Sequence, residues 1–183
     1  MCTYMKSNIL SAVSLSLFAV LVIMACSVDD DSQENYFTTG AGTHLVTLAA
    51  KIGPPIPLEN ASGGTFYRHQ VKFWDGGYTY TNNVVTGEGE TVEFWLNTLS
   101  ETVEPNNYIL QKNDANGSWG QIAQGTWTSA ENMDEGEASV KGGLMRITKE
   151  NDVYTISYDL ELDGRIYTTL KGYYQGKLEM IEE

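Results

Sequence analysis

The two histidines are the residues best suited to hold a metal. His44 and His69 each lie in a predicted strand. Imidazole nitrogens ligate haem iron and other transition metals, so strands that brought both rings together would form a haem or metal capture site. The alternative is a pair of ordinary strand histidines whose hydrogen bonds are satisfied within the fold. Metalloprotease spacing is absent from the sequence.

Catalytic motifs are also absent. The segment Gly117-Ser118-Trp119-Gly120 places its serine one position too early for a nucleophile elbow, and a Ser-His-Asp set would have to assemble from scattered strands. The segments Asn113–Gly117 and Glu131–Glu137 offer oxygen ligands for calcium without EF-hand spacing, which favours a turn and a solvated acidic loop. We therefore expect no enzymatic activity and no cofactor.

Aromatic residues are the most informative group, and Trp95 is the one that core packing explains least. It alternates along one predicted strand so that it shares a face with Glu93 and Asn97. The opposite face carries Val92, Phe94 and Leu96. The alternation predicts an exposed indole beside carboxylate and amide groups, an arrangement that can stack on a sugar ring and bind its hydroxyls.

The first 25 residues predict a cleaved signal peptide. An apolar run over residues 9–25, interrupted by serines, follows Lys6 and is shorter than the ~20 residues of a membrane-spanning helix. The residues Ile23-Met24-Ala25-Cys26 resemble the bacterial lipobox. That resemblance implies cleavage after Ala25 and acylation of the Cys26 thiol, with palmitate or similar chains as the anchor. Cleavage would also remove Cys2, so the mature chain could form no disulfide.

Residues 26–42 predict a disordered tether between the lipidated cysteine and the folded domain. Its acidic run, Asp29, Asp30 and Asp31, resembles the export signal of Bacteroidota lipoproteins, which implies an outer-membrane protein that faces the cell exterior. The alternative for this run is a solvated linker.

The charge balance excludes one class of partner. Without Lys6, the mature chain carries 10 cations and 24 anions, a net charge of −14. Nucleic acids and anionic lipid surfaces repel such a protein, because lysine and arginine drive binding to phosphate. We expect no nucleic-acid partner and membrane association only through the lipid anchor.

Residues 43–183 predict one all-β domain. Tyr154, Ile156, Tyr158, Leu160 and Leu162 alternate with polar residues, the period of a strand with one buried face. Asp163-Gly164 predicts a two-residue hairpin turn into a return strand over 165–174, and Glu150-Asn151-Asp152 predicts another turn. Further strands are predicted at 43–50, 66–74, 78–80, 91–99, 108–111, 121–127, 144–148 and 177–181, and residues 53–57 predict an irregular proline loop.

Many short strands separated by turn residues are typical of a sandwich or a barrel. Because the strands are uneven in length and two loops interrupt them, we predict an antiparallel two-sheet sandwich. A small β-barrel of the calycin-like kind is the alternative.

Residues 88–181 resemble a recurring pattern in Bacteroidota surface lipoproteins with a β-rich C-terminal domain of unknown function. The matching segments are 87–96, 104–108, 152–156, 163–165 and 172–178. Asn107 stands where that pattern usually has glycine. The motifs are turns and strand faces, so the resemblance implies a fold and a location and no catalytic residue.

Together these features predict a lipid-anchored surface lipoprotein that acts as a glycan- or protein-binding accessory module. Two alternatives stay open. One is a haem or metal capture protein that uses the histidine pair. The other is a structural subunit of a surface assembly, which would need an exposed sheet edge or a donated strand.

Overall fold

The computed structural model describes residues 33–40, 42–60, 62–82, 84–110, 121–129 and 137–182. The predicted signal peptide, Cys26 and the aspartates Asp29, Asp30 and Asp31 lie outside these residues, as do residues 113–117 and 131–136 of the two oxygen-rich segments. Within the described part of the chain, no helix is long and apolar enough to cross a membrane.

The described residues form strands joined by turns and loops and contain no helix. The strands are β1 (Tyr36–Thr39), β2 (Gly42–Glu59), β3 (Thr65–Asp75), β4 (Tyr78–Thr81), β5 (Val84–Gly87), β6 (Glu90–Thr98), β7 (Asn106–Leu110), β8 (Gln121–Ser129), β9 (Glu137–Glu150), β10 (Val153–Leu162), β11 (Thr169–Gly176) and β12 (Glu179–Ile181).

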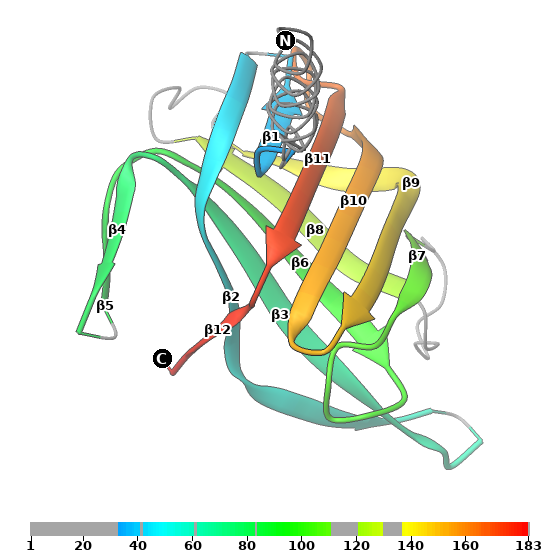
Figure 1. Cartoon of the computed structure of the whole chain (residues 1–183). Helices are drawn as coiled ribbons and strands as arrows, with labels where there is room; N and C mark the ends of the chain where they lie inside the picture. The colour runs from blue at the N-terminus through cyan, green and yellow to red at the C-terminus, as the bar shows by residue number, and fades with distance from the viewer. Residues whose placement is uncertain are drawn as a thin grey trace, which may run out of the picture. The chain divides into compact units, whose positions relative to one another are not determined.

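Nine of these strands close into a barrel, in the order β1-β11-β10-β9-β7-β8-β6-β3-β2 (Figure 1). Closure occurs because β1 pairs with both β11 and β2. The short β7 lies between β8 and β9, which also pair directly with each other. The all-β prediction is confirmed, but the sandwich prediction is wrong and the barrel alternative is correct.

The barrel closes because part of the predicted tether forms a strand. β1 lies within residues 26–42, and its Phe37 is fully buried in the core. The folded barrel therefore begins earlier than the predicted start at Thr43. Register shifts between Ile52 and Ile56, and between Trp95 and Leu96, add bulges that help a sheet to curl.

The barrel interior is apolar and filled by side chains. Its fully buried members include Phe37, Phe73, Phe94, Leu96, Tyr108, Ile122, Trp127, Ile156, Leu160 and Leu162. In β10 the predicted alternation is confirmed, because Tyr154, Ile156, Tyr158, Leu160 and Leu162 are all buried while their neighbours are half-buried or exposed. Asn151, at a φ of 54°, forms the predicted turn between β9 and β10.

The predicted turn at Asp163-Gly164 is not formed. The last pair between β10 and β11 joins Glu161 to Thr169, so residues 163–168 are a loop and the return strand starts later than predicted. Asp163 pairs instead with β9, because its backbone N–H donates to Ser139 O (2.9 Å) and its Oδ1 accepts from Ser139 N–H (2.8 Å).

Strands β4 and β5 form a separate hairpin outside the barrel, beside β2 (Figure 1). A second apolar cluster lies on this outer side, where Ala50, Ile52, Trp74 and Ile181 are buried. β12 contributes to it by pairing in parallel with β2 at residues 50–52. The hairpin and β12 thus cover part of the outer face of β2 and β3 and leave the rest open.

Candidate ligand-binding groove

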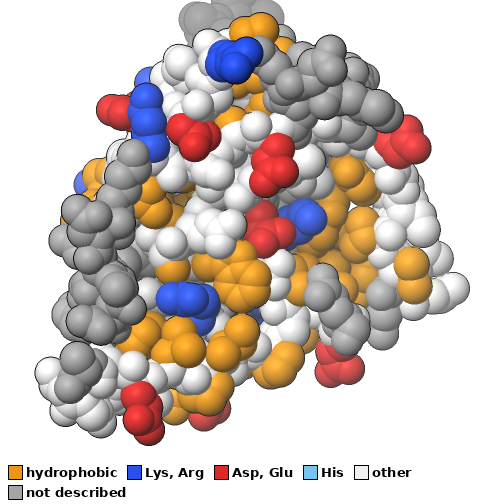
Figure 2. Space-filling model, turned by 180° about the vertical axis from the view of Figure 1, so that it is seen from behind, with side chains coloured by type: hydrophobic (Ala, Val, Ile, Leu, Met, Phe, Trp, Pro, Cys, Tyr) orange, Lys and Arg blue, Asp and Glu red, His pale blue; other side chains and the backbone are white. Residues whose placement is uncertain are grey.

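A groove crosses the uncovered outer face of the barrel. A hollow of about 740 Å³ lies over β2 and β3 beside β12, and a smaller one of about 230 Å³ lies toward β8. Ile56, Arg68 and Trp95 line both hollows, so the two meet at these side chains. Figure 2 views the barrel from this side and shows hydrophobic side chains gathered on it beside a few charged ones.

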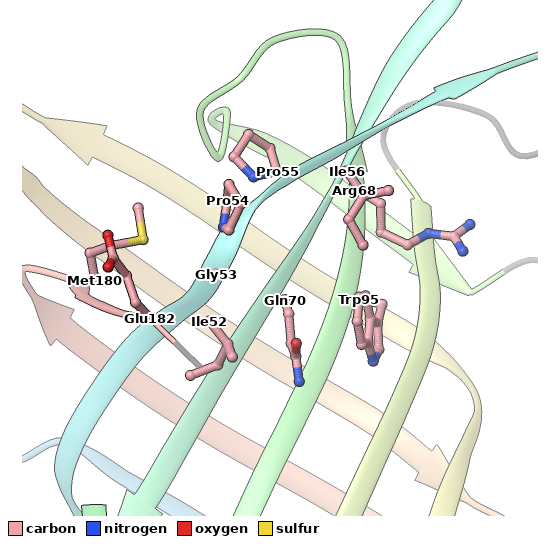
Figure 3. Close-up of a pocket in the computed structure, with 10 residues that line it drawn as sticks. All are labelled: Ile52, Gly53, Pro54, Pro55, Ile56, Arg68, Gln70, Trp95, Met180 and Glu182. Carbon is pink, nitrogen blue, oxygen red and sulfur yellow. The ribbon is translucent and has the colours of Figure 1, made fainter. Parts of the chain in front are cut away.

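One wall of the groove is the irregular part of β2. Pairing with β3 stops at Ile52 and resumes at Ile56, because the intervening residues, Gly53-Pro54-Pro55, form a bulge. Gly53 has a φ of 64°, which favours glycine, and proline has no N–H to offer to a neighbouring strand. The prolines that predicted a loop therefore lie within β2, where they shape the groove wall shown in Figure 3.

The floor is built by cross-strand neighbours. Trp95 in β6 lies opposite Gln70 in β3 on one side and Gln124 in β8 on the other. The amide groups therefore flank the indole across the sheet, and Gln70 and Trp95 both line the larger hollow (Figure 3). The groove combines one aromatic ring with several hydrogen-bonding groups.

Trp95 is half-buried, and its orientation is fixed by a neighbour on its own strand. Its Nε1–H donates to Glu93 Oε1 at 2.9 Å, while Lys72 Nζ lies 3.7 Å from Glu93 Oε2. The predicted shared face of Glu93 and Trp95 is therefore present, but Glu93 is occupied by the indole and the lysine. Its role here is to hold the ring.

Asn97 lies on the same side of β6 as Trp95 but is buried, with 1% of its surface exposed. Its Oδ1 accepts a hydrogen bond from Arg68 Nε at 3.0 Å. Asn97 therefore orients Arg68 and is itself buried, so the polar group that lines the groove at this point is the half-buried guanidinium of Arg68.

His69 is buried on the interior side of β3, opposite the face that carries Arg68 and Gln70. Its Nε2 lies 2.9 Å from Thr98 Oγ1 and 3.1 Å from the carbonyl oxygen of Ser100. Because that carbonyl can only accept, Nε2 carries the proton. Burial lowers the pKa of His69 below its ordinary 6.5, so the ring is neutral in the folded barrel near neutral pH.

His44 lies near the other end of β3, between two carboxylates. Its Nε2 is at ion-pair distance from Glu90 Oε2 (3.1 Å) without hydrogen-bond geometry, and its Nδ1 is 3.5 Å from Asp75 Oδ2. The ring stacks on Phe37 with centroids 5.2 Å apart. Asp75 is held in turn by accepting the backbone N–H groups of Gly77 and Glu90.

The structure does not bring the two histidines together. His44 contacts Asp75, which lies six residues from His69 along β3, a separation of roughly 20 Å in an extended strand. No group of three or more side chains that could hold a metal ion is found among the described residues. The two ring nitrogens of His44 face different carboxylates.

Comparison with known proteins adds no relative. No family model, curated protein or solved structure matches the chain.

Of the groove residues, only Trp95 was predicted as a site residue, and the polar residues around it that were missed are Arg68, Gln70 and Gln124. Arg68 and Gln70 alternate with His69 and Val71, a pattern that does place them on one face of a strand. The pattern does not identify the partner strand. β3 pairs with β6, although the β4–β5 hairpin separates them in the sequence.

The neutral, buried His69 predicts a specific pH dependence of stability. In the unfolded chain this histidine takes up a proton as pH falls through about 6.5, whereas the folded barrel resists it. Its contribution is therefore fully present above pH 6.5 and is lost as pH falls toward the lower pKa of the folded state. Denaturant unfolding of the parent and of His69→Gln at several pH values measures this effect. The parent should lose more stability than the variant below pH 6.5, and parallel curves would contradict the assignment.

Proposed function

We propose that the protein is a lipid-anchored binding module on the outer face of the outer membrane, and that it binds a saccharide in the groove around Trp95. The observation that carries this proposal is the position of Trp95, which lines both hollows and is held in place by Glu93.

The chemistry of the groove suits a sugar. A pyranose ring presents apolar C–H groups on its face and hydroxyls around its rim. The indole supplies an apolar surface, and Gln70, Gln124 and Arg68 supply donors and acceptors beside it. Binding sites of this kind are typically lined by apolar and aromatic groups with a few polar groups that fix the ligand's orientation.

The filled interior supports a site on the outside. A calycin-like barrel would hold a small ligand inside, as lipocalins do. Here Phe73, Phe94 and Tyr158 occupy the interior with their rings in contact, at centroid distances of 5.1–6.2 Å. Haem capture by a histidine pair is not supported, because His44 and His69 lie far apart. A structural subunit that accepts or donates a strand needs a free sheet edge, and the closed barrel gives little support to that alternative.

The anchor part of the proposal rests on the sequence around Cys26. Nine residues separate Cys26 from the start of β1 at Tyr36, and nine residues span at most about 32 Å when fully extended. Such a short connection would keep the barrel close to the membrane surface, where a groove could contact saccharides of the cell envelope or its surroundings.

The glycan proposal predicts that Trp95→Ala weakens saccharide binding about tenfold or more, because the loss of stacking and apolar contact is worth about 1.4 kcal/mol or more. A glycan array followed by calorimetric titration of the purified protein measures this. Tyr173→Ala is the matched control, since Tyr173 is a half-buried aromatic on β11, on another part of the barrel.

Trp95→Ala should leave the denaturant midpoint close to that of the parent. If no saccharide binds, or if the variant binds as well as the parent, the glycan proposal fails. A variant that mainly unfolds would assign Trp95 a structural role.

The anchor proposal predicts that Cys26→Ser abolishes acylation, because serine has no thiol to receive the lipid. Incorporation of radiolabelled palmitate in cells measures this, with protease accessibility on intact cells as the readout of surface exposure. Replacement of Asp29, Asp30 and Asp31 by alanine is the companion variant, which should stay acylated but lose exposure. Palmitate label on Cys26→Ser would overturn the anchor.

A further inference from the structure

We propose that Arg68 makes the groove selective for saccharides that carry an anionic group, either a carboxylate or a sulfate. This inference rests on the proposed saccharide function and names the class of ligand for the same site.

Arg68 is held in place by one side-chain hydrogen bond, and most of its donors have no partner among the described residues. Its Nε–H is used by Asn97 Oδ1, at 3.0 Å, and Asn97 is buried beneath it. A guanidinium has five N–H donors in a rigid plane, so this bond fixes the plane and leaves the terminal nitrogens available. The side chain extends past Trp95 at the edge of the larger hollow, as Figure 3 shows.

The charge of Arg68 has no carboxylate partner among the described residues. Four of the described lysines do have one: Lys72 pairs with Glu93, Lys141 with Glu161, Lys171 with Asp159 and Lys177 with Asp152. Glu93, the acid beside Trp95, is already engaged by Lys72 and by the indole. In a chain with a net charge of −13, this guanidinium places a positive charge without an ion-pair partner beside Trp95 in the groove.

A partly buried cation is costly unless an anion meets it, and the planar fork of arginine matches carboxylate and sulfate oxygens two at a time. A ligand anion at this point would gain two charge-assisted hydrogen bonds while its sugar ring rests on Trp95. Glu182 lines the groove at the other end, beside Met180, so the anionic group is directed to the Trp95 end (Figure 3).

The groove accommodates more than one sugar unit. Its lining residues come from β12, β2, β3, β6 and β8, which are successive neighbours in the sheet. Four interstrand spacings of about 4.8 Å give a length of roughly 19 Å. We therefore infer an acidic oligosaccharide as the ligand class.

Titration of the purified full-length protein with matched probes tests this inference. One arm compares oligogalacturonate with its methyl-esterified, neutral form, and the other compares a carrageenan oligosaccharide with its desulfated form. The acidic member of at least one pair should bind about tenfold or more tightly than its neutral counterpart, and added salt should reduce the difference. The arm with the larger ratio identifies carboxylate or sulfate as the recognised group.

Two variants assign the preference to Arg68. Arg68→Gln should bring the acidic and neutral probes to similar affinities, and Arg68→Lys should keep part of the preference, because it retains the charge without the fork. Arg146→Gln is the matched control, since Arg146 Nε also donates to an asparagine, Asn107, but lies outside the groove. That variant should keep the preference intact.

The failures of the two proposals are distinguishable. Equal binding of acidic and neutral probes overturns the inference and leaves saccharide binding standing. A preference that survives Arg68→Gln also overturns it. The absence of binding to any probe or array glycan removes the proposed function and the inference together. If Arg68→Gln does not fold, the acidic and neutral probes are compared on the parent and on Arg68→Lys. A preference that is as strong in Arg68→Lys as in the parent would then overturn the inference.

Discussion

Replacement of Phe37 by alanine is expected to lower the free energy of unfolding by about 3–5 kcal/mol, the cost typical of truncating a buried phenylalanine. Phe37 is fully buried, and it lies in β1, the strand that joins β11 to β2 and closes the barrel. Its ring also stacks on His44. The variant therefore loses core volume at the seam of the barrel, and denaturant unfolding measures the loss.

The matched control is Glu34→Ala, because Glu34 lies three residues earlier and is exposed. It should change stability by less than about 0.5 kcal/mol. If residues 26–42 were a tether throughout, both substitutions would be neutral. Equal and small effects would therefore contradict the closure of the barrel by β1.

The parts of the fold that could be predicted are those set by local sequence. In β10 every second residue is apolar, and the turn at Asn151 uses a residue that tolerates positive φ. Both features depend on neighbours in the chain. The hairpin of β9 and β10 was therefore predicted correctly.

The sandwich prediction failed because closure depends on pairings that local sequence does not encode. β1 is four residues long and follows a polar, acidic segment, so its composition did not distinguish it from the tether. In the sheet, β7 lies between β8 and β9. In the sequence, β7 lies between β6 and β8, although β6 and β8 pair with each other. A pattern of alternating residues indicates which face of a strand is buried, but it does not identify the neighbouring strands.

Because alternation does not identify neighbouring strands, it also predicted the candidate site only in part. The alternation in β6 correctly placed Trp95 and Glu93 on the face opposite Phe94. It also predicted that Asn97 lies beside Trp95 as a ligand-binding residue. Asn97 is instead buried and bonded to Arg68 from β3, and Arg68 lines the groove in its place. Residues contributed by other strands were missed because cross-strand register decides them.

Replacement of Trp127 by alanine is expected to lower the free energy of unfolding by about 3–5 kcal/mol. Trp127 is fully buried in β8, and its ring meets Tyr167 edge-on with centroids 4.8 Å apart. Its Nε1–H donates to Glu90 Oε2 at 2.8 Å. The substitution therefore removes core volume and also deprives a buried carboxylate of a donor. Equilibrium denaturation measures the sum of these effects.

Two further variants separate volume from hydrogen bonding. Trp127→Phe keeps an aromatic ring but has no N–H, so it should cost less than Trp127→Ala and still about 1–3 kcal/mol, because Glu90 is 7% exposed and needs its donors. In the double variant with Glu90→Leu, which has no acceptor for the indole N–H, the two losses should be less than additive, because each single change already breaks the same bond. Additive losses, or a Trp127→Phe variant as stable as the parent, would show that the bond between Trp127 and Glu90 contributes nothing and that packing alone makes Trp127 important.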